Sequence, residues 1–291
     1  KVVLFSLPEL DGAVDTVVLG GLVGDKIALV PERVRKLGAR LRGWVNLRRT
    51  PPRNRRVAVL LYGFPPNVGA VGTAALLNVP ASLEQLLRGL MGQGYDLGPE
   101  AESVDGEALV AALKAKQVMS QESVVGKGFA QLQPVVDHAS GLDESFSYRV
   151  AAPSRLGGAR VTGDGIPTTR MERYLSKRMV RRLEKGGWGD LDRYRGVATT
   201  GGGDMVVAGL QLGNVFIGVQ PVLGIEGDPM RLMFERDLTP HPQYAAFYHG
   251  GGGSEGFGAQ AVVHLGMHGT VEWLPGSPLG NTHETWPDLL M

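Results

Sequence analysis

Cysteine is absent from this chain of 291 residues. Disulfides, thiolate zinc sites and a cysteine nucleophile are therefore excluded, and such a composition is typical of a cytoplasmic protein. Long apolar runs are missing too, since none approaches the roughly 20 residues that a membrane-spanning helix needs. The formal charge is only +1, which gives no electrostatic reason to expect nucleic acid as a partner. The sequence thus predicts a cytoplasmic protein with no transmembrane segment and no nucleic-acid partner.

A nucleotide-binding fingerprint is missing from the most suggestive loop. Gly69, Gly72 and Thr73 lie in a Gly/Pro-rich segment that follows a predicted strand. The segment matches neither G-x-G-x-x-G nor a Walker A sequence, and no lysine follows it. We therefore exclude a nucleotide site in this loop.

Glycine, in contrast, is abundant, at 43 of 291 residues, about twice its usual share. So much glycine indicates many tight turns and close backbone approaches, which a helical bundle does not need. Short runs of β-branched residues alternate with segments of helical periodicity, and this predicts an α/β protein. The predicted strands are Val57–Tyr62, Asn214–Val219 and Gln260–His264, and the predicted helices are Pro31–Trp44, Ser82–Met91 with Ser82 as N-cap, Glu100–Lys116 and Met171–Leu183.

The predicted fold is a parallel sheet with flavodoxin-like or Rossmann-like layers. We expect its three strands to deliver their loops to a shared cleft, as open α/β sheets do. The chain divides into an α/β segment at 1–116, a mixed and partly helical segment at 117–203, and an α/β segment at 204–291 that carries the active-site loops.

Two basic segments each allow two interpretations. Arg48–Arg56 surrounds a double proline, and Met171–Leu183 forms a helix with a basic side. The first could bind an anion and the second a protein partner. No aromatic residue is interleaved with the first segment, and a solvated face is the usual role of such charges. We therefore favour a solvated connector and a solvated helix face.

A run of four glycines at 250–253 ends a predicted helix that includes Tyr244, Phe247 and Tyr248. Each glycine costs up to ~1 kcal/mol in a helix, and the run has the composition of a flexible linker. It is either native or a replacement for a native helical segment, and both interpretations stay open.

Residues that could carry chemistry are concentrated between Asn214 and Gly280. This stretch holds two predicted strands, and each of them ends in a loop rich in glycine, proline, histidine and carboxylates. Open α/β sheets build their sites in loops of this kind. The stretch contains four of the six histidines and three notable carboxylates: His241, His249, His264, His268, Glu226, Asp228 and Glu272.

His264, His268 and Glu272 are spaced four residues apart, as ligands on one side of a helix would be. The valines and glycines around them argue against a helix. We instead predict a strand that ends near His264, followed by a loop that carries His268 and Glu272. Gly266 and Gly269 in this loop let the backbone approach a flat or bulky ligand. His264 by itself is more typical of a buried structural histidine, whereas His268 and Glu272 together favour function.

The loop after Asn214–Val219 carries a second group of polar residues. Gln220 follows the strand directly, and Glu226 and Asp228 come next. Asp228 precedes a proline and suits a helix cap equally well, so Glu226 is the better candidate. Carboxylates and imidazoles without thiols suit the removal of protons from nitrogen or oxygen and the binding of a hard cation such as Mg²⁺.

Several longer segments resemble one protein family. They are ELDGA, WVNLRR, GFPPNVGAVGTAALLNV, NVFIGVQP, GIEGDPMRLMF, TPHPQYAAFY and FGAQAVVHLGMHGTVEWLPG. In these segments the chain is similar to the large, porphyrin-binding H subunit of magnesium chelatase, in its bacteriochlorophyll branch. The large subunit of cobaltochelatase shares the H-G-x-x-E-W-L-P-G element, whereas GVQP and EGDPMRL favour the magnesium enzyme. The match covers residues 1–95 and 205–288, and because H subunits are several times longer, the chain is expected to correspond to a fragment or a minimised core.

The resemblance implies a subunit of a magnesium chelatase, a ligase that forms metal–nitrogen bonds in (bacterio)chlorophyll biosynthesis. The implied substrates are protoporphyrin IX and Mg²⁺, and ATP is hydrolysed by separate AAA+ subunits that act with an adaptor subunit. The Mg-protoporphyrin methyltransferase is a further implied partner. The implied location is the cytoplasm, with the periphery of a photosynthetic membrane as an alternative. Two other functions stay open: a cobaltochelatase large subunit acting on a corrin precursor, and a non-catalytic tetrapyrrole-binding module.

The resemblance also implies roles for individual residues. Glu272 and His268 are the expected catalytic residues, which accept protons or pass Mg²⁺ to the ring. The residues expected to contact the porphyrin are Gln220, Glu226, His264, Gly266, Gly269 and Trp273. Transient Mg²⁺ ligands are expected at Glu272, His268 and Asp228.

Overall fold

A computed structural model of the chain divides it into two compact units, Lys1–Arg49 and Thr50–Met291. The structure describes residues 7–13, 17–62, 73–74, 76–99, 104–122, 166–167, 177–188, 204–205, 209–221, 239–249, 257–266, 271, 274–275, 282 and 284–290. Each unit is described separately, and the predicted division at 116 and 203 stays a prediction.

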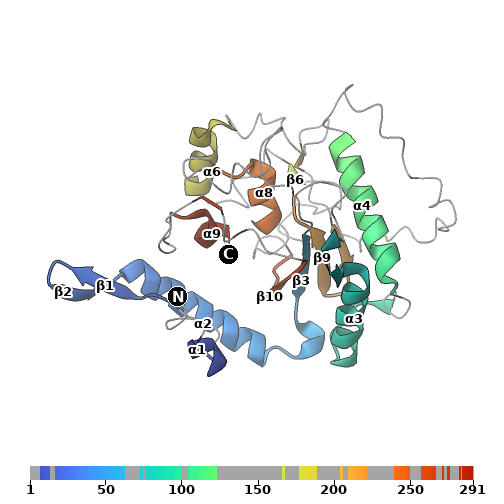
Figure 1. Ribbon diagram of the computed structural model, residues 1–291, viewed down its shortest axis with the longest axis horizontal. Helices are drawn as coiled ribbons and strands as arrows, with labels where there is room; N and C mark the ends of the chain where they lie inside the picture. Colours follow the sequence, from blue (N-terminus) through green and yellow to red (C-terminus); the bar gives the residue numbers. More distant parts are fainter. Residues whose placement is uncertain are drawn as a thin grey trace. The chain divides into compact units, whose positions relative to one another are not determined.

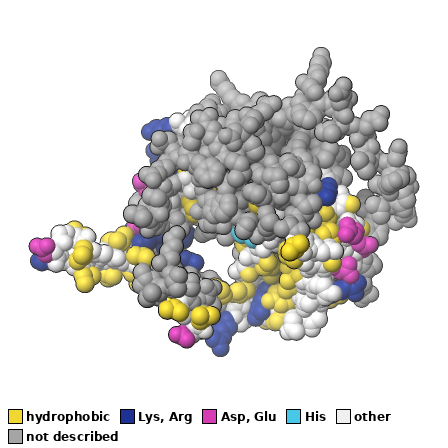
Figure 2. Space-filling view, viewed as in Figure 1, with side chains coloured by type: hydrophobic (Ala, Val, Ile, Leu, Met, Phe, Trp, Pro, Cys, Tyr) yellow, Lys and Arg dark blue, Asp and Glu magenta, His cyan; other side chains and the backbone are white. Residues whose placement is uncertain are grey.

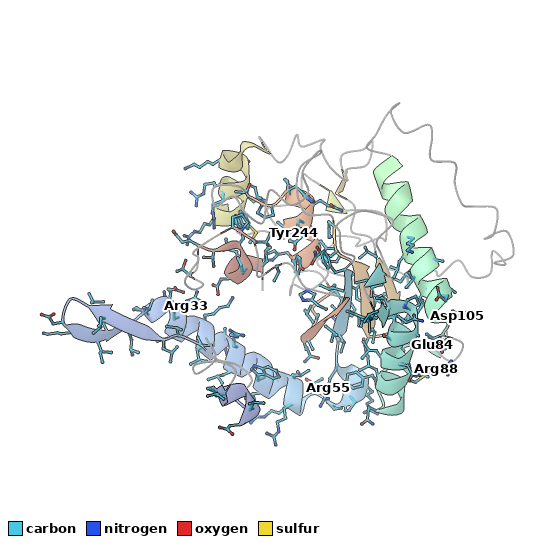
Figure 3. All side chains as sticks on the ribbon, viewed as in Figure 1. Arg33, Arg55, Glu84, Arg88, Asp105 and Tyr244 are labelled. Carbon is cyan, nitrogen blue, oxygen red and sulfur yellow. The ribbon has the colours of Figure 1, made fainter. Side chains whose placement is uncertain are left out.

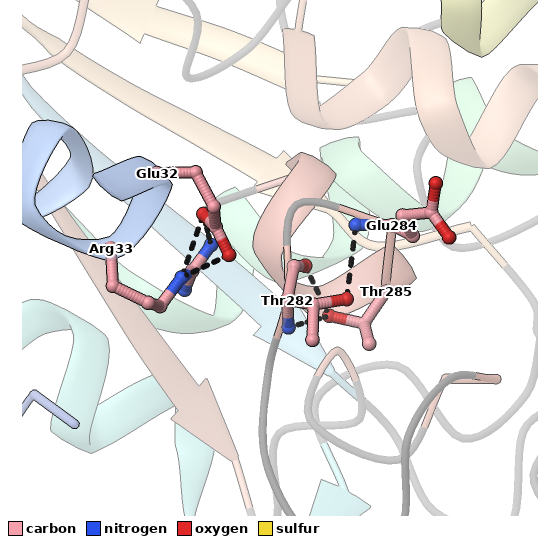
Figure 4. A network of polar contacts seen from close by, with 5 residues as sticks. All are labelled: Glu32, Arg33, Thr282, Glu284 and Thr285. Carbon is pink, nitrogen blue, oxygen red and sulfur yellow. Dashed lines mark hydrogen bonds and ion pairs between the residues drawn. The ribbon is translucent and has the colours of Figure 1, made fainter. Parts of the chain in front are cut away.

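The first unit contains a short helix, a hairpin and a long helix. These are α1 (Leu7–Leu10), the antiparallel strands β1 (Gly20–Val23) and β2 (Lys26–Leu29), and α2 (Pro31–Arg49). Helix α2 extends five residues beyond the predicted end at Trp44 and stops before a double proline, which cannot continue a helix. In its first turn the Arg33 guanidinium pairs with the Glu32 carboxylate at 2.6 Å (Figure 4). Hydrophobic side chains are exposed along the hairpin (Figure 2).

The second unit is built on a four-stranded sheet in the order β10-β3-β9-β8 (Figure 1). The strands are β3 (Val57–Tyr62), β8 (Gly209–Leu212), β9 (Val215–Val219) and β10 (Ala261–Gly266). Strands β10, β3 and β9 run parallel, and β8 pairs antiparallel with β9 through a two-residue turn in which Gly213 takes a φ of 51°. The predicted α/β class and parallel sheet are confirmed, because the three predicted strands are neighbours whose carboxyl ends share one edge.

Successive side chains of each strand point to opposite faces of the sheet, and both faces are apolar. Helices cover both of them (Figure 1). Val57, Val59 and Leu61 point toward α3 (Val79–Gly92) and α4 (Gly106–Glu122). Ala58 and Leu60 belong to the core on the other face, with buried residues of α6 (Lys177–Leu183), α8 (Pro242–Phe247) and α9 (Trp286–Leu290). The shorter elements are a 3₁₀ turn at Pro52–Asn54, a π turn at Glu184–Trp188, and the strand pairs β4 (Thr73–Ala74) with β5 (Leu77–Asn78) and β6 (Ile166–Pro167) with β7 (Asp204–Met205).

The starts of two helices differ from the sequence prediction. Helix α3 begins three residues before Ser82, because the Asn78 side chain accepts a hydrogen bond from the Ala81 N–H at 3.0 Å. Ser82 is therefore not the N-cap. Helix α4 begins at Gly106 rather than at Glu100, with the Asp105 carboxylate accepting from the first free N–H groups at 2.8 and 3.2 Å. Glu84 of α3 accepts from Arg88 and from the first N–H of α4, and these side chains meet where the two helices join (Figure 3).

The basic connector before β3 makes contacts within the fold. Arg55 donates from Nη1 to the Tyr95 hydroxyl at 3.0 Å and from Nε to the Thr50 carbonyl at 2.8 Å. Arg56 donates to the Phe257 carbonyl at 3.1 Å. The segment is a connector, as predicted, but its arginines also fix the start of the sheet.

The basic helix α6 is only partly a solvated face. Arg178 pairs with the Glu284 carboxylate, and Arg182 donates to the Glu284 carbonyl and lies 4.6 Å from the centre of the Trp286 ring. Burial, helped by the nearby Arg178 charge and opposed by Glu284, lowers the pKa of Arg182 from its usual value. Both arginines thus contact Glu284, which lies in a hydrogen-bonded bend from Thr282 to Thr285 just before α9 (Figure 4), and Arg182 also contacts the first residue of α9. None of the helices in the described part of the chain is long and apolar enough to cross a membrane.

Candidate functional site

Three of the predicted site residues lie at the carboxyl edge of the parallel strands. Gln220 follows β9 directly, and its N–H donates to the Leu61 carbonyl of β3 at 3.0 Å. His264 and Gly266 lie on β10. The other predicted residues are outside the described part of the chain, so their roles stay predictions: Glu226, Asp228, His268, Gly269, Glu272 and Trp273.

The parallel register places His264 and Gln220 on the same face of the sheet. His264 pairs with Leu60 on β3, and Leu60 pairs in turn with Gly218 on β9, two residues before Gln220. Neighbouring residues across a sheet project to one face, and so do residues two apart along a strand. This is the face covered by α8. The interpretation of His264 as a strand residue rather than a helical ligand is confirmed.

Tyr248, which the sequence prediction did not include, joins these two side chains. It follows the last residue of α8, and its hydroxyl donates to Gln220 Oε1 at 2.5 Å and lies 3.4 Å from His264 Nε2. The Tyr248 and His264 rings meet edge to face, with centroids 6.2 Å apart. Tyr248 and Gln220 are each only 4% exposed, whereas His264 is partly exposed. Two buried polar side chains, Tyr248 and Gln220, thus lie beside a partly exposed imidazole.

Gly266 ends β10 where two strands come close together. A Cβ atom at this position would lie 2.5 Å from the carbonyl oxygen of Tyr62 on β3, a distance that real Cβ atoms do not reach. The pairing of β10 with β3 thus explains this glycine without a ligand, and its predicted porphyrin contact stays a prediction.

Within the described ranges, no group of three or more His, Asp or Glu side chains is arranged to hold a metal ion. The residues predicted to bind Mg²⁺ transiently lie outside those ranges. The described part of the site therefore offers hydrogen-bonding and proton-accepting groups beside the apolar core.

Comparison with known proteins identifies the family. A family model described as CobN/Magnesium Chelatase matches residues 2–291. The chain belongs to the CobN/magnesium chelatase family. This confirms the family that the sequence motifs indicated.

Relatives from both branches of the CobN/magnesium chelatase family align with almost the whole chain. The H subunit of magnesium chelatase from Chlorobaculum parvum is 35% identical over 99% of this chain, and that from Rhodobacter capsulatus is 33% identical over 99%. The CobN subunit of aerobic cobaltochelatase from Pseudomonas aeruginosa is 29% identical over 98%. The chain spans about a fifth of the length of these relatives, between 19% and 22%.

A solved structure in the family has the same fold. The catalytic subunit of cobaltochelatase from Mycobacterium tuberculosis superposes with a TM-score of 0.62 and 26% identity, over 97% of this chain and 21% of that one. The α/β architecture described above is therefore shared with a CobN/magnesium chelatase family member.

Replacement of Gly266 by alanine in this family member is expected to lower the free energy of unfolding by about 1–3 kcal/mol, because the new methyl group forces β10 away from the Tyr62 carbonyl. Gly89→Ala is the matched control. Gly89 lies in α3 with open space around it, so alanine there should stabilise the chain by about 0.5–1 kcal/mol. Urea denaturation of both variants measures the difference. Equal stabilities for the two would contradict the close strand approach.

Two other histidines of the 214–280 stretch, His241 and His249, are buried or partly buried within the fold. His241 caps α8, accepting from the Tyr244 N–H on Nδ1 at 3.2 Å, and is 1% exposed. His249 follows Tyr248, and its Nε2 is buried without a hydrogen-bond partner, as is one further ring nitrogen in the described part of the chain, on Trp286. Burial lowers the pKa of His249, and a backbone hydrogen bond with Leu289 opposes this.

This lowered pKa predicts that the chain loses stability in mild acid. Above pH ~6.5 the ring is neutral in both states. Below that pH the unfolded chain takes up a proton that the folded chain does not, so stability falls until the lower folded-state pKa is reached, by at most about 1.4 kcal/mol per pH unit. His249→Gln should flatten the stability profile of urea denaturation between pH 7 and 5. Comparison at pH 8 separates lost packing from lost titration, and parallel profiles for the two proteins would contradict the assignment.

Proposed function

We propose that the chain is part of the porphyrin-binding subunit of a magnesium chelatase, which inserts Mg²⁺ into protoporphyrin IX. The observation that carries this proposal is the alignment of 98–99% of the chain with magnesium-chelatase H subunits at 32–35% identity. Cobaltochelatase subunits align over a similar share at 27–29%. The magnesium branch is therefore favoured, within a family whose named members insert either metal.

The sheet edge has the chemistry that this reaction needs. Metal insertion removes two protons from pyrrole nitrogens and takes water from tightly hydrated Mg²⁺. In this proposal His264 supplies a proton-accepting imidazole and Gln220 an amide, from β10 and from the end of β9, the two parallel strands on either side of β3. A flat macrocycle bound across the carboxyl edge would meet the partly exposed His264 ring, with the buried Gln220 behind it, at the position where open α/β sheets bind ligands.

The loops that follow β9 and β10 complete the proposed site. Glu272 and His268 accept the pyrrole protons or pass Mg²⁺ to the ring, and Glu226 and His264 support them. Asp228 is a transient Mg²⁺ ligand in this proposal. Gly266 and Gly269 let the macrocycle approach the backbone, and Trp273 offers it a flat apolar surface.

ATP hydrolysis is assigned in this proposal to separate AAA+ subunits that act with an adaptor, and the Mg-protoporphyrin methyltransferase receives the product. The proposed location is the cytoplasm. The chain spans about a fifth of the H subunits, so these assignments concern the whole subunit of which the chain would form a part.

A metal-insertion assay tests the proposal in the assembled chelatase, with the full-length subunit that contains this sequence and its partner subunits. Mg²⁺ and Co²⁺ are each supplied with a porphyrin and with a metal-free corrin, and the product is followed by its absorption spectrum. Only the Mg²⁺–porphyrin pair should react with ATP. If the Co²⁺–corrin pair were the only one to react, the result would instead establish the cobaltochelatase function. The likeness to the solved cobaltochelatase subunit favours that alternative. If the subunit bound a tetrapyrrole but inserted neither metal, the result would indicate a non-catalytic tetrapyrrole-binding module.

A further inference from the structure

The first unit leaves its apolar side chains exposed. Among the residues of this unit that the structure describes, Arg33 is the one buried residue, and no apolar side chain is buried. On the hairpin the exposed fraction reaches 74% for Leu22 and 86% for Ile27, and on α2 it is 40% for Val34 and 55% for Leu41. Contiguous exposed apolar surface of this kind marks an interaction site.

The elements of this unit are weak without a covering surface. A two-stranded hairpin by itself is marginally stable at best in water. Helix α2 contains Gly38 and Gly43, and glycine in a helix interior weakens the helix. Most of the stability of a helix in a protein comes from packing of its apolar side, and α2 buries none of its described apolar side chains. A surface outside this unit therefore has to supply the packing.

One side of α2 is arranged to receive such a surface. Val34, Leu41 and Val45 are separated by seven and four residues, so at 3.6 residues per turn they share one side of the helix. All three are exposed, Val45 to 46%. These three residues are called the α2 stripe below.

A row of arginines borders the α2 stripe. Arg35, Arg42 and Arg49 repeat every seven residues, and the first two directly follow residues of the stripe in the sequence. They therefore lie along one edge of it. All three are exposed, and none of them forms a hydrogen bond or an ion pair with another described residue. These three residues are called the arginine row.

The charge of α2 favours an acidic protein surface as the partner. The helix has seven basic side chains and one acidic side chain, Glu32, which already pairs with Arg33. Six of the seven basic residues are arginine, which is enriched in protein interfaces, whereas lysine is depleted there. A second copy of the same helix is disfavoured, because it would bring like charges together.

The rest of a longer subunit is the source that fits best. The chain spans between 19% and 22% of the relatives it aligns with, so most of such a subunit is polypeptide joined to this chain. A segment of the same polypeptide has a much higher effective concentration near α2 than a separate protein has.

We propose that α2 and the β1–β2 hairpin form a docking segment for another part of the full-length subunit, outside these 291 residues. The covering segment is a helix whose apolar side packs on the α2 stripe and whose Asp and Glu side chains pair with the arginine row. The seven-residue repeat on α2 is the spacing that two packed helices share. The inference rests on the proposed function only in taking the chain as part of a longer subunit, and it does not depend on the metal or the macrocycle.

Hydrogen–deuterium exchange tests whether α2 is covered. The purified full-length subunit that contains this sequence is compared with the 291-residue chain, and mass spectrometry follows the peptides of α2 and β3. The α2 amides should exchange at least about tenfold more slowly in the full-length subunit, because packing stabilises a helix that is otherwise marginal. Slow exchange of β3 in both proteins is the control for a folded sheet. Equal exchange of α2 in the two proteins would overturn the proposal.

Photocrosslinking in the full-length subunit identifies what covers α2 and does not need the short chain. Leu41→p-benzoylphenylalanine places the crosslinker on the α2 stripe. Ala39→p-benzoylphenylalanine is the matched control, because Ala39 is exposed and lies about 200° around the helix from Leu41. Position 41 should crosslink to an apolar helix with neighbouring Asp and Glu residues, in the same polypeptide but outside the 291 residues, and position 39 should not. A crosslink from position 41 into the 291 residues or to a second copy, equal crosslinking from both positions, or no crosslink at all would overturn the proposal.

Charge variants of the full-length subunit test the arginine row. Changing Arg35, Arg42 and Arg49 together to glutamate places carboxylates opposite carboxylates, so the α2 amides should exchange about tenfold faster. Changing the same three residues to lysine keeps the charge, and exchange should stay within about threefold of the wild type. Equal exchange rates for the two variants would contradict an acidic covering surface.

Anionic vesicles distinguish a lipid surface from a protein surface. Vesicles of phosphatidylglycerol and phosphatidylcholine, added to the full-length subunit, should leave the exchange of α2 unchanged, because the α2 stripe is already covered. Slow exchange that appears only with the vesicles would assign α2 to a lipid surface and overturn the proposal. Failure of the wild-type assembly to insert Mg²⁺ would overturn the proposed function and leave the exchange and crosslinking results intact.

Discussion

Replacing Leu61 by alanine is expected to lower the free energy of unfolding by about 2–5 kcal/mol. Leu61 is fully buried on β3, the strand that pairs with both β9 and β10. Its side chain packs with the apolar residues of α3 and α4. The expected loss combines the transfer of the removed methyl groups with the cavity left behind, and it is a large fraction of the roughly 5–15 kcal/mol by which domains are stable.

Leu76→Ala is the matched control for this prediction, because Leu76 is fully exposed. The same change there should alter stability by no more than about 0.5 kcal/mol. Urea denaturation followed by circular dichroism measures both variants. If Leu61→Ala were as mild as Leu76→Ala, the central strand would not be the core that the structure shows.

Glu272→Gln is expected to reduce the rate of metal insertion by about 10²–10⁴-fold in the assembled chelatase, the range attributed to a positioned general base. The amide keeps the shape of the side chain but cannot accept a pyrrole proton at neutral pH. Porphyrin affinity should change by less than about threefold, because the lost interaction acts on the proton and not on the macrocycle. Initial rates at saturating porphyrin, together with a binding titration, measure the two effects.

Glu284→Gln provides the control for this charge removal. Glu284 is exposed and pairs with Arg178 on α6, so its variant should insert Mg²⁺ at the wild-type rate. A Glu272→Gln enzyme as fast as the Glu284→Gln enzyme would remove Glu272 from the mechanism.

The sheet was predictable because each of its parallel strands corresponds to a short apolar run in the sequence. Val57–Tyr62 is an unbroken apolar run, and it forms β3 at the predicted bounds. The strand predicted at 260–264 continues to Gly266, since pairing with β3 extends to Tyr62. Helix starts were harder to predict, because Asn78 and Ser82 are both plausible caps and only the Ala81 N–H contact distinguishes them.

Interactions between distant parts of the chain were not readable from the sequence. Tyr248 contacts Gln220 and His264 across 28 and 16 positions, and no local pattern specifies that geometry. The available signal was general: a tyrosine beside an apolar helix needs a partner for its hydroxyl when it is buried. Arg182 is similar, since its contact with Trp286 joins α6 to α9.

The candidate site was predicted in part. Gln220 and His264 were placed at the ends of two strands, and the structure brings them to one hydroxyl group on the same face of the sheet. The sequence suggested that Gly266 makes room for a ligand. The structure shows that the close pairing of β10 with β3 also requires a glycine there. The roles of Glu272, His268 and the other loop residues stay predictions that the insertion assay addresses.

A fluorescence titration of the 291-residue chain with a water-soluble protoporphyrin IX analogue tests the central claim most directly. The four tryptophans of the chain report binding by quenching of their emission. The account predicts saturable quenching with one porphyrin per chain, by the wild type and by Glu272→Gln alike. Absence of saturable binding to the folded wild-type chain would contradict the claim that this sheet edge and its loops bind the macrocycle.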